Sequence, residues 1–178
     1  MATLLVITGP PGAGKSTAAR VLADAAERSV LVEGDAFFGF LASGAIEPWL
    51  PESSEQNEVV TRAAASAAGR FADGGFTAIY DGVVGPWFLP TVAAATGLDG
   101  LEYVVLLPPV ETCVARVRGR RNHGFSDETA TRKMHAEFTE AEISARHVLH
   151  QASEDVTTVV DSITASLERG HLTYAPVR

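Results

Sequence analysis

The chain has 178 residues, a length that suits one domain with a single apolar core. Its formal net charge of −8 disfavours nonspecific attraction to nucleic acid or to anionic lipid. A single cysteine excludes an internal disulfide, the first eight residues lack the positive charge of a secretory signal, and no apolar run approaches the roughly 20 residues that span a bilayer. We therefore expect one soluble, cytoplasmic domain over residues 1–178, with neither nucleic acid nor a membrane as partner.

Short apolar or β-branched runs alternate along the chain with Ala-rich or amphipathic stretches. The short runs predict strands, and the longer stretches between them predict helices. This alternation is typical of a parallel sheet that carries helices on both faces. The predicted strands are residues 3–8, 30–33, 76–80, 101–107 and 156–160, and the predicted helices are residues 15–28, 55–73, 86–96, 109–121 and 127–151.

The stretch GPPGAGKST, residues 9–17, lies between the first predicted strand and the first predicted helix and fits the phosphate-loop motif G-x-x-x-x-G-K-[ST]. Its glycines let backbone N–H groups face a β-phosphate, Lys15 can reach the β and γ oxygens, and the Ser16 hydroxyl can bind Mg²⁺. The sequence has no guanine-reading N-K-x-D motif, so ATP is the expected ligand. The predicted nucleotide-binding residues here are Gly9, Pro11, Gly12, Ala13, Gly14, Lys15, Ser16 and Thr17, and Lys15 is also a predicted catalytic residue.

Two carboxylates follow predicted strands, Asp35 in VLVEGDAFF and Asp81 in FTAIYDGVVG. Both are expected at the carboxyl edge of the sheet, where ligands bind in open α/β folds. We assign Asp81 to Mg²⁺, together with Ser16, because Asp81 ends an apolar strand as a Walker B acid does. Asp35 is assigned to the acceptor hydroxyl and to catalysis. The alternatives are that Asp35 caps a helix starting at Ala36 and that Asp81 is a turn residue.

An arginine-rich stretch, CVARVRGRRNHGFSDETATRK, covers residues 113–133. It predicts a lid over approximately residues 118–130, which would close over ATP and bring a guanidinium to the transferred group. Arg116 and Arg120 have i, i+4 spacing on one helix face and are the first candidates for phosphate contact, with Arg120 catalytic, while Arg121 and Arg132 come second. The alternative is a solvated helix end whose arginines favour the C-terminal dipole.

The phosphate loop, VEGDAFF and RVRGRRNHGF, in this order, resemble the small P-loop kinases that include gluconate kinase, shikimate kinase and chloramphenicol phosphotransferase. The resemblance implies a P-loop NTPase three-layer sandwich of the nucleoside-kinase-like kind, with a mobile lid and a five-stranded parallel sheet of order 2-3-1-4-5. It also implies that Asp35 is the base, that Arg120 or its neighbour contacts the phosphates, and that the segment Asp161-Ser162-Ile163 lines the adenine. Ser162 is therefore a further predicted nucleotide-binding residue.

Two departures from these kinases concern the acceptor. Gluconate kinases continue the second-strand acid into a His-Pro segment, whereas this chain reads GDAFFGFLASG. Shikimate kinases hold a carboxylate with several arginines, whereas residues 36–61 contain none and only Arg62 and Arg70 lie between that stretch and the arginine-rich segment. The acceptor is therefore expected to differ from both gluconate and shikimate.

The acceptor side is predicted to be aromatic and free of positive charge, because residues 36–61 contain three phenylalanines, one tryptophan and four glutamates but neither Lys nor Arg. Such a pocket favours a neutral or cationic acceptor and disfavours a nucleoside monophosphate. The alternative is that these aromatic side chains belong to the core. The predicted substrate-binding residues are Asp35, Phe38, Trp49, Arg62, Asp81 and Trp87.

The sequence therefore predicts ATP- and Mg²⁺-dependent phosphoryl transfer to a hydroxyl of a small molecule that lacks its own phosphate, either a metabolite or an antibiotic. Two other functions stay open: an ATP-binding regulatory or interaction module with slow ATPase activity, and a nucleotide kinase. The expected partner is the small-molecule acceptor, and a homodimer is possible.

Overall fold

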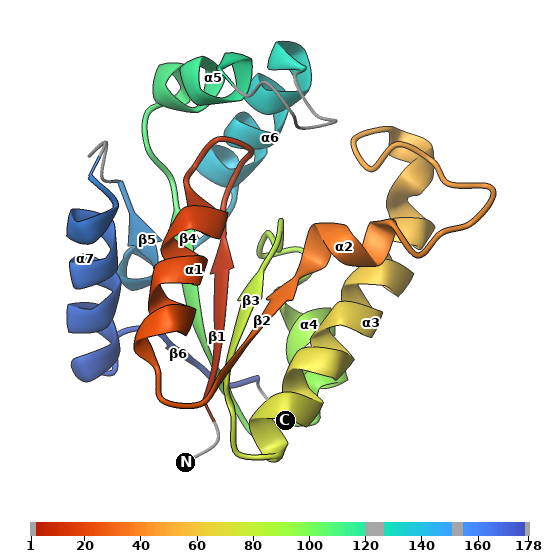
Figure 1. The fold of residues 1–178 in the computed structure, drawn as a ribbon. Helices are drawn as coiled ribbons and strands as arrows, with labels where there is room; N and C mark the ends of the chain where they lie inside the picture. The colour runs from red at the N-terminus through yellow and green to blue at the C-terminus, as the bar shows by residue number, and fades with distance from the viewer. Residues whose placement is uncertain (1–2, 120–126, 151–154, 177–178) are drawn as a thin grey trace.

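The computed structural model describes residues 3–119, 127–150 and 155–176. A twisted sheet lies at its centre, and its strands follow the order β2-β3-β1-β4-β5 with parallel pairing throughout (Figure 1). A short sixth strand pairs antiparallel with the first residues of β4. The predicted α/β fold class and strand order are thus confirmed. The strands are β1 Thr3–Thr8, β2 Ser29–Glu33, β3 Thr77–Asp81, β4 Leu101–Leu106, β5 Val148–Leu149 and β6 Thr173–Tyr174.

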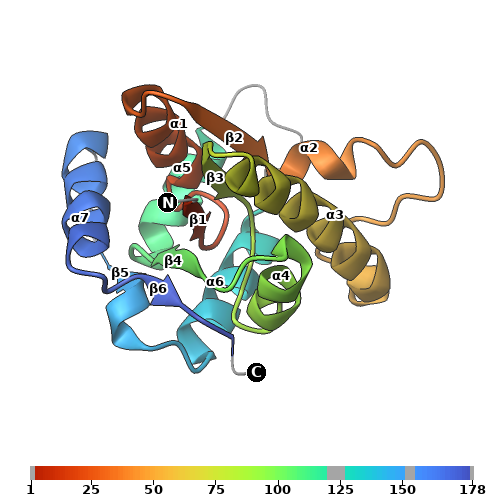
Figure 2. The ribbon, with the colours of Figure 1, turned by 90° about the horizontal axis from the view of Figure 1, so that it is seen from below.

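Helices cover both faces of the sheet, which gives the three layers visible in Figures 1 and 2. One face packs against α3, α4 and the Phe138 ring of α6, and the other face packs against α1 and α7. The helices are α1 Lys15–Ala25, α2 Gly34–Phe38, α3 Ser54–Asp73, α4 Leu89–Thr96, α5 Val110–Arg118, α6 Glu128–Glu140 and α7 Val156–Glu168, with 3-10 turns at Pro51–Ser53 and Ala145–His147.

Small side chains bring the longest helix, α3, close to the sheet. Ala64, Ala65, Ala68 and Ala72 recur at helical spacing on one face of α3, and all four are fully buried. Alanine keeps the side-chain volume low at favourable helix propensity, so that the helix backbone lies directly over β3. The helix ends at Asp73, where the predicted helix 55–73 also ends, with Gly74 as its C-cap.

The end of the chain departs from the prediction. The predicted helix 127–151 stops at Glu140, and the fifth strand is only Val148–Leu149, paired with the end of β4. The predicted strand at 156–160 is wrong, since VTTVV begins α7. Its β-branched residues favour a strand, but Asp155 caps the helix by accepting a hydrogen bond from the Thr157 N–H at 2.9 Å.

The carboxyl ends of the three neighbouring strands β2, β3 and β1 are level with one another. Asp81, the last residue of β3, is in register with Ile7 on one side and with Glu33 on the other. The loop between β1 and α1 and the short helix α2 both leave the sheet at this edge. Groups that are distant in the sequence therefore meet here.

None of the helices within residues 3–119, 127–150 and 155–176 is both long and apolar enough to cross a membrane.

Candidate active site

The loop between β1 and α1 has the backbone geometry of a phosphate loop. Gly9, Gly12 and Gly14 have φ of 139°, 79° and 97°, in the region that favours glycine. The Lys15 ammonium donates a hydrogen bond to the Pro10 carbonyl at 3.1 Å, and the Arg116 guanidinium lies 3.3 Å from the Gly12 carbonyl. Lys15, at the start of α1, and Arg116, on α5, thus both contact the loop, and their contact with phosphate stays a prediction.

A substitution at Gly12 tests the conformation of the phosphate loop directly. A Cβ atom at Gly12 would lie 2.3 Å from the Cys113 carbonyl oxygen, and its positive φ adds strain for any other residue. We expect Gly12→Ala to lower the free energy of unfolding by about 1–3 kcal/mol and to abolish ATP binding, measured by urea unfolding and by nucleotide titration. Gly119→Ala is the matched control, because its φ is −75° and its Cβ would lie 3.5 Å from the nearest atom. Equal stability and ATP affinity in the two variants would contradict the assignment of this loop as a phosphate loop.

Asp81 lies beside the phosphate loop and is only 7% exposed. Burial raises the pKa of Asp81 above its ordinary value, while the Lys15 charge and a hydrogen bond from the Ser16 side chain lower it, and the charges of Asp35 and Glu33 raise it again. The members of the predicted metal pair, Ser16 and Asp81, therefore lie near each other at this edge of the sheet. Because Asp81 ends β3 and is buried, it is part of the strand and not a turn residue.

This pair fits a magnesium ion. A buried carboxylate among further carboxylates has a negative charge that one lysine offsets only in part, and a hydroxyl and a carboxylate are oxygen ligands of the kind that Mg²⁺ prefers. Among the described residues, no group of three or more His, Cys, Asp or Glu side chains could hold a metal alone. Mg²⁺ usually takes most of its ligands from water and substrate phosphates, so that a pair is sufficient.

Asp35 is an exposed residue in the first turn of α2, directly after β2. Glu33 is the N-cap of this helix, so the alternative that Asp35 is the cap is wrong. Glu33 pairs with Arg20 at 2.5 Å. Asp35 acts on the pKa of Asp81, which places the two carboxylates within electrostatic range of each other at the same edge of the sheet.

The predicted acceptor residues separate into two groups. Phe38 and Trp49 are half-buried, and Phe37 packs on the core cluster next to α3, so that the alternative of core aromatics holds for Phe37. Phe40 is 74% exposed. Arg62, on the exposed side of α3, lies 4.0 Å from Glu58.

Trp87 forms the apolar wall of an open cavity of about 520 Å³, which Glu137, Glu140 and Ala141 complete. The indole is 45% exposed, and its ring lies 5.3 Å from the Phe138 ring. Glu137 and Glu140 were missed in the sequence, although their i, i+3 spacing on a helix after the arginine-rich stretch indicates a shared face. The cavity is therefore aromatic and acidic.

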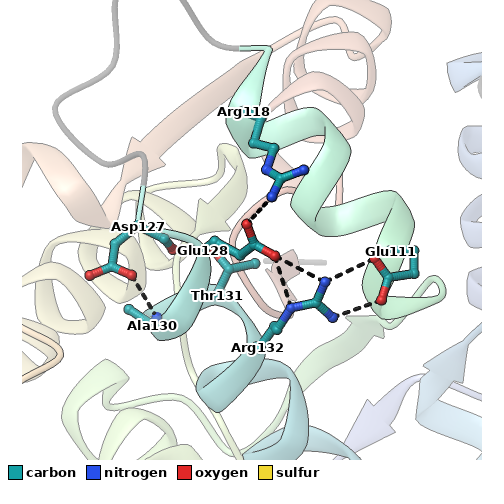
Figure 3. Close-up of polar contacts among 7 residues, drawn as sticks. All are labelled: Glu111, Arg118, Asp127, Glu128, Ala130, Thr131 and Arg132. Atoms are coloured by element: carbon teal, nitrogen blue, oxygen red, sulfur yellow. Dashed lines mark hydrogen bonds and ion pairs between the residues drawn. The ribbon is translucent and has the colours of Figure 1, made fainter.

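Arg118 and Arg132 belong to an ion-pair network between α5 and α6 (Figure 3). The Arg132 guanidinium donates two hydrogen bonds to Glu111, at 2.7 and 2.9 Å, and two to Glu128, which also accepts one from Arg118. The alternative of helix-end arginines thus describes Arg118, in the last turn of α5, whereas Arg132 lies near the start of α6. Arg120 and Arg121 lie outside the described residues, as does most of the predicted lid.

The contribution of this ion-pair network to the stability of the protein depends on pH. Hydrogen bonds from Arg132 lower the pKa values of Glu111 and Glu128, so the stability that it adds is present above their ordinary value of 4.5 and is lost as the pH falls through the lowered values. We expect Arg132→Gln to lower the urea midpoint slightly at pH 7, by less than Gly12→Ala does, because water reaches every member of the network. The difference should disappear in acid, whereas Lys133→Gln should show little difference at any pH. A pH-independent loss would contradict this role.

Ser162 lies within α7, where its hydroxyl donates a hydrogen bond to the Thr158 carbonyl at 2.9 Å. It was assigned to the adenine because it would follow a strand at 156–160, and that strand is a helix. The last parallel strand is β5, so the segment that follows it begins at His150 instead. The prediction for Ser162 thus rested on a wrong element.

A phosphate loop after β1, on a parallel sheet of order 2-3-1-4-5, defines a P-loop NTPase fold of the kinase-like kind. The family model described as "AAA domain" matches residues 4–142, and the chain belongs to this family. Among curated proteins, no match was found.

Solved structures share the fold over almost the whole chain. The tunicamycin resistance protein of Deinococcus radiodurans is 17% identical with a TM-score of 0.70, covering 98% of this chain and 99% of that chain. A sugar kinase from Janibacter sp. HTCC2649 is 18% identical with a TM-score of 0.69, covering 93% and 94%. A gluconokinase from Sinorhizobium meliloti 1021 is 16% identical with a TM-score of 0.66, covering 95% and 93%. These similarities match the group of small P-loop kinases expected from the sequence.

Proposed function

We propose that the protein transfers the γ-phosphoryl group of ATP to a hydroxyl of a small molecule that lacks its own phosphate. The observation that carries this proposal is the meeting of the phosphate loop, the Ser16–Asp81 pair and Asp35 at one edge of the sheet. Phosphoryl transfer needs a phosphate cradle, a metal site and a group that orients the acceptor, and these three components supply them. The kinases among the similar structures add support.

Each residue has one role in the proposed reaction. The loop N–H groups and Lys15 hold the phosphates, and Ser16 and Asp81 hold Mg²⁺, which neutralises charge on the transferred group when it is bound. Asp35 accepts a hydrogen bond from the acceptor hydroxyl and takes its proton as the new O–P bond forms and the bond to ADP breaks. A lid arginine, Arg120 first, stabilises the charge on the transferred group.

The acceptor is proposed to be neutral or cationic, because the segments expected to form its site are rich in aromatic and acidic side chains. Trp87 with Glu137 and Glu140 lines the cavity after β3, and no Lys or Arg occurs from Ser29 to Thr61. A phosphate on the acceptor would meet carboxylates there, which would repel it. This charge distribution disfavours a nucleotide kinase.

A screen of unphosphorylated metabolites and antibiotics for ATP-dependent phosphorylation tests the proposal. Each compound is offered together with its phosphorylated form, and product is identified by mass spectrometry. We expect turnover only with unphosphorylated hydroxyl compounds and only with Mg²⁺. Turnover confined to nucleoside monophosphates would contradict the proposal.

An ATP-binding interaction module is the second candidate, and exposed apolar side chains favour it. Phe40 is 74% exposed, Val59 60% and Leu50 43%, and all three come from the segment around α2 and the start of α3. Such side chains can hold a protein partner or a second copy of the chain. If the protein is such a module, its ATP hydrolysis should be slow and no small molecule should accelerate it.

A further inference from the structure

Tyr80, which the proposed reaction does not use, lies against Gly34 and Gly82, the sequence neighbours of Asp35 and Asp81. Tyr80 precedes Asp81 in β3, and it is 2% exposed. Its side chain belongs to the core cluster on the α3 face, whereas Ile79, the preceding residue, belongs to the cluster on the opposite face. The phenol nevertheless extends towards the carboxyl edge of the sheet, where two glycines lie against it.

Gly34 and Gly82 both leave room for the Tyr80 ring. A Cβ atom at Gly34 would lie 2.9 Å from the ring carbon Cε2 and 3.2 Å from the hydroxyl oxygen, and a Cβ atom at Gly82 would lie 3.2 Å and 3.3 Å from the same two atoms. Gly34 directly precedes Asp35, and Gly82 directly follows Asp81. The ring edge is therefore wedged between the backbone segments that carry the two carboxylates.

The ring cannot easily move away from these segments. It packs in a close-packed core with Val32, Val84 and the buried alanines of α3, so that a displaced ring would have to overlap neighbouring atoms. The contacts with Gly34 and Gly82 on one side and with the core on the other therefore fix the position of the ring.

We propose that Tyr80 is a positioning residue whose ring sets the separation between Asp35 and Asp81, with Gly34 and Gly82 as the glycines that this contact requires. Its catalytic part rests on the proposed function, since Asp35 faces the acceptor and Asp81 the metal in that reaction. A shift of about 1 Å in such a pair can cost about a hundredfold in rate. The ring therefore acts on turnover through the two carboxylates, without touching substrate.

The test is a set of paired substitutions. Gly34→Ala places a Cβ atom 2.9 Å from the Tyr80 ring and 3.1 Å from the Asp81 carbonyl oxygen. It should lower kcat about 10- to 100-fold, with the affinity for ATP changed less than threefold, and removal of the ring should relieve the closer of the two contacts. Tyr80→Leu removes the ring and should lower kcat similarly, whereas Tyr80→Phe keeps the ring and should retain kcat within about threefold. The decisive variant is the double substitution Gly34→Ala with Tyr80→Leu. Its loss of stability to urea should be smaller than the sum of the two single losses, and its kcat should be higher than the product of the two single effects predicts.

Tyr103→Leu is the matched control, because Tyr103 is equally buried but lies on β4. Combined with Gly34→Ala, it should give additive losses of stability and rate. Additive effects for Gly34 with Tyr80 would overturn the inference, and so would a strong coupling in urea midpoints without an effect on kcat. A wild-type protein that phosphorylates no acceptor contradicts the proposed function instead, and the coupling of the urea midpoints then decides whether the wedge exists.

Discussion

Replacing Asp35 with asparagine is expected to lower acceptor-dependent phosphoryl transfer by about 10²- to 10⁴-fold, the usual contribution of a general base. The substitution keeps the shape of the side chain and removes its ability to take a proton. Mg²⁺–ATP affinity should change little, because the loop and Lys15, which are proposed to hold the phosphates, follow β1, and β3 with Asp81 lies between β1 and β2. Initial rates at saturating ATP and a nucleotide-binding titration measure the two effects separately.

Asp73→Asn is the matched control, since Asp73 is an exposed aspartate at the far end of α3, before β3 begins. It should keep both transfer and ATP binding. If Asp35→Asn transfers phosphate as fast as Asp73→Asn does, then Asp35 is only a first-turn residue of α2 and the base must be sought elsewhere.

Asp81→Asn should have opposite effects on activity and on stability. Removing the carboxylate that is proposed to hold Mg²⁺ should lower Mg²⁺-dependent activity by about a hundredfold or more, since even outer partners of a metal contribute up to that much. The same change removes a buried charge whose pKa burial has raised. The free energy of unfolding at neutral pH should therefore rise.

The pH dependence of stability checks whether the buried charge of Asp81 causes this expected gain in stability. A carboxyl group with a raised folded pKa binds its proton more tightly in the folded state, so it stabilises the protein at low pH. That stability is lost as the pH rises from the ordinary value of 3.8 through the raised value. Urea midpoints of wild type and Asp81→Asn should thus diverge over this range. A variant that is less stable than wild type at neutral pH would contradict the burial argument.

Local patterns in the sequence predicted the donor half of the site. Lys15 and Ser16 have a fixed spacing to the loop glycines, so one short motif specifies both the backbone turn and the groups that it presents. Asp35 and Asp81 were predicted at one edge because parallel strands end there. Asp81 ends β3 and Asp35 lies in the first turn of α2, so the alternatives of a turn and of a cap were wrong, while the roles of both carboxylates stay predictions.

The prediction of a strand at VTTVV was wrong because its β-branched residues fit a strand as well as one face of a helix. Val159, Val160 and Ile163 lie on the core side of α7, a spacing that is helical and could have been read together with the Asp155 cap. Tertiary pairing also shortened the true fifth strand to two residues, which no propensity pattern can indicate.

Contacts between distant segments could not be predicted from the sequence. Arg132 reaches Glu111 across 21 positions, and the Tyr80 ring meets Gly34 from the neighbouring strand. Both depend on how helices and strands pack, and neither has a local signal. The same holds for the open cavity beside Trp87, because its acidic residues Glu137 and Glu140 come from α6.

The most direct test of the central claim follows the γ-phosphate itself. ATP labelled in its γ-phosphate is incubated with the protein, Mg²⁺ and each unphosphorylated hydroxyl compound that the screen selects, and the labelled products are separated. We predict that the label appears in an acid-stable phosphate ester of the acceptor, and that Asp35→Asn abolishes this product. Label found only in inorganic phosphate, at a rate that is the same with and without acceptor, would contradict a kinase and favour the interaction module.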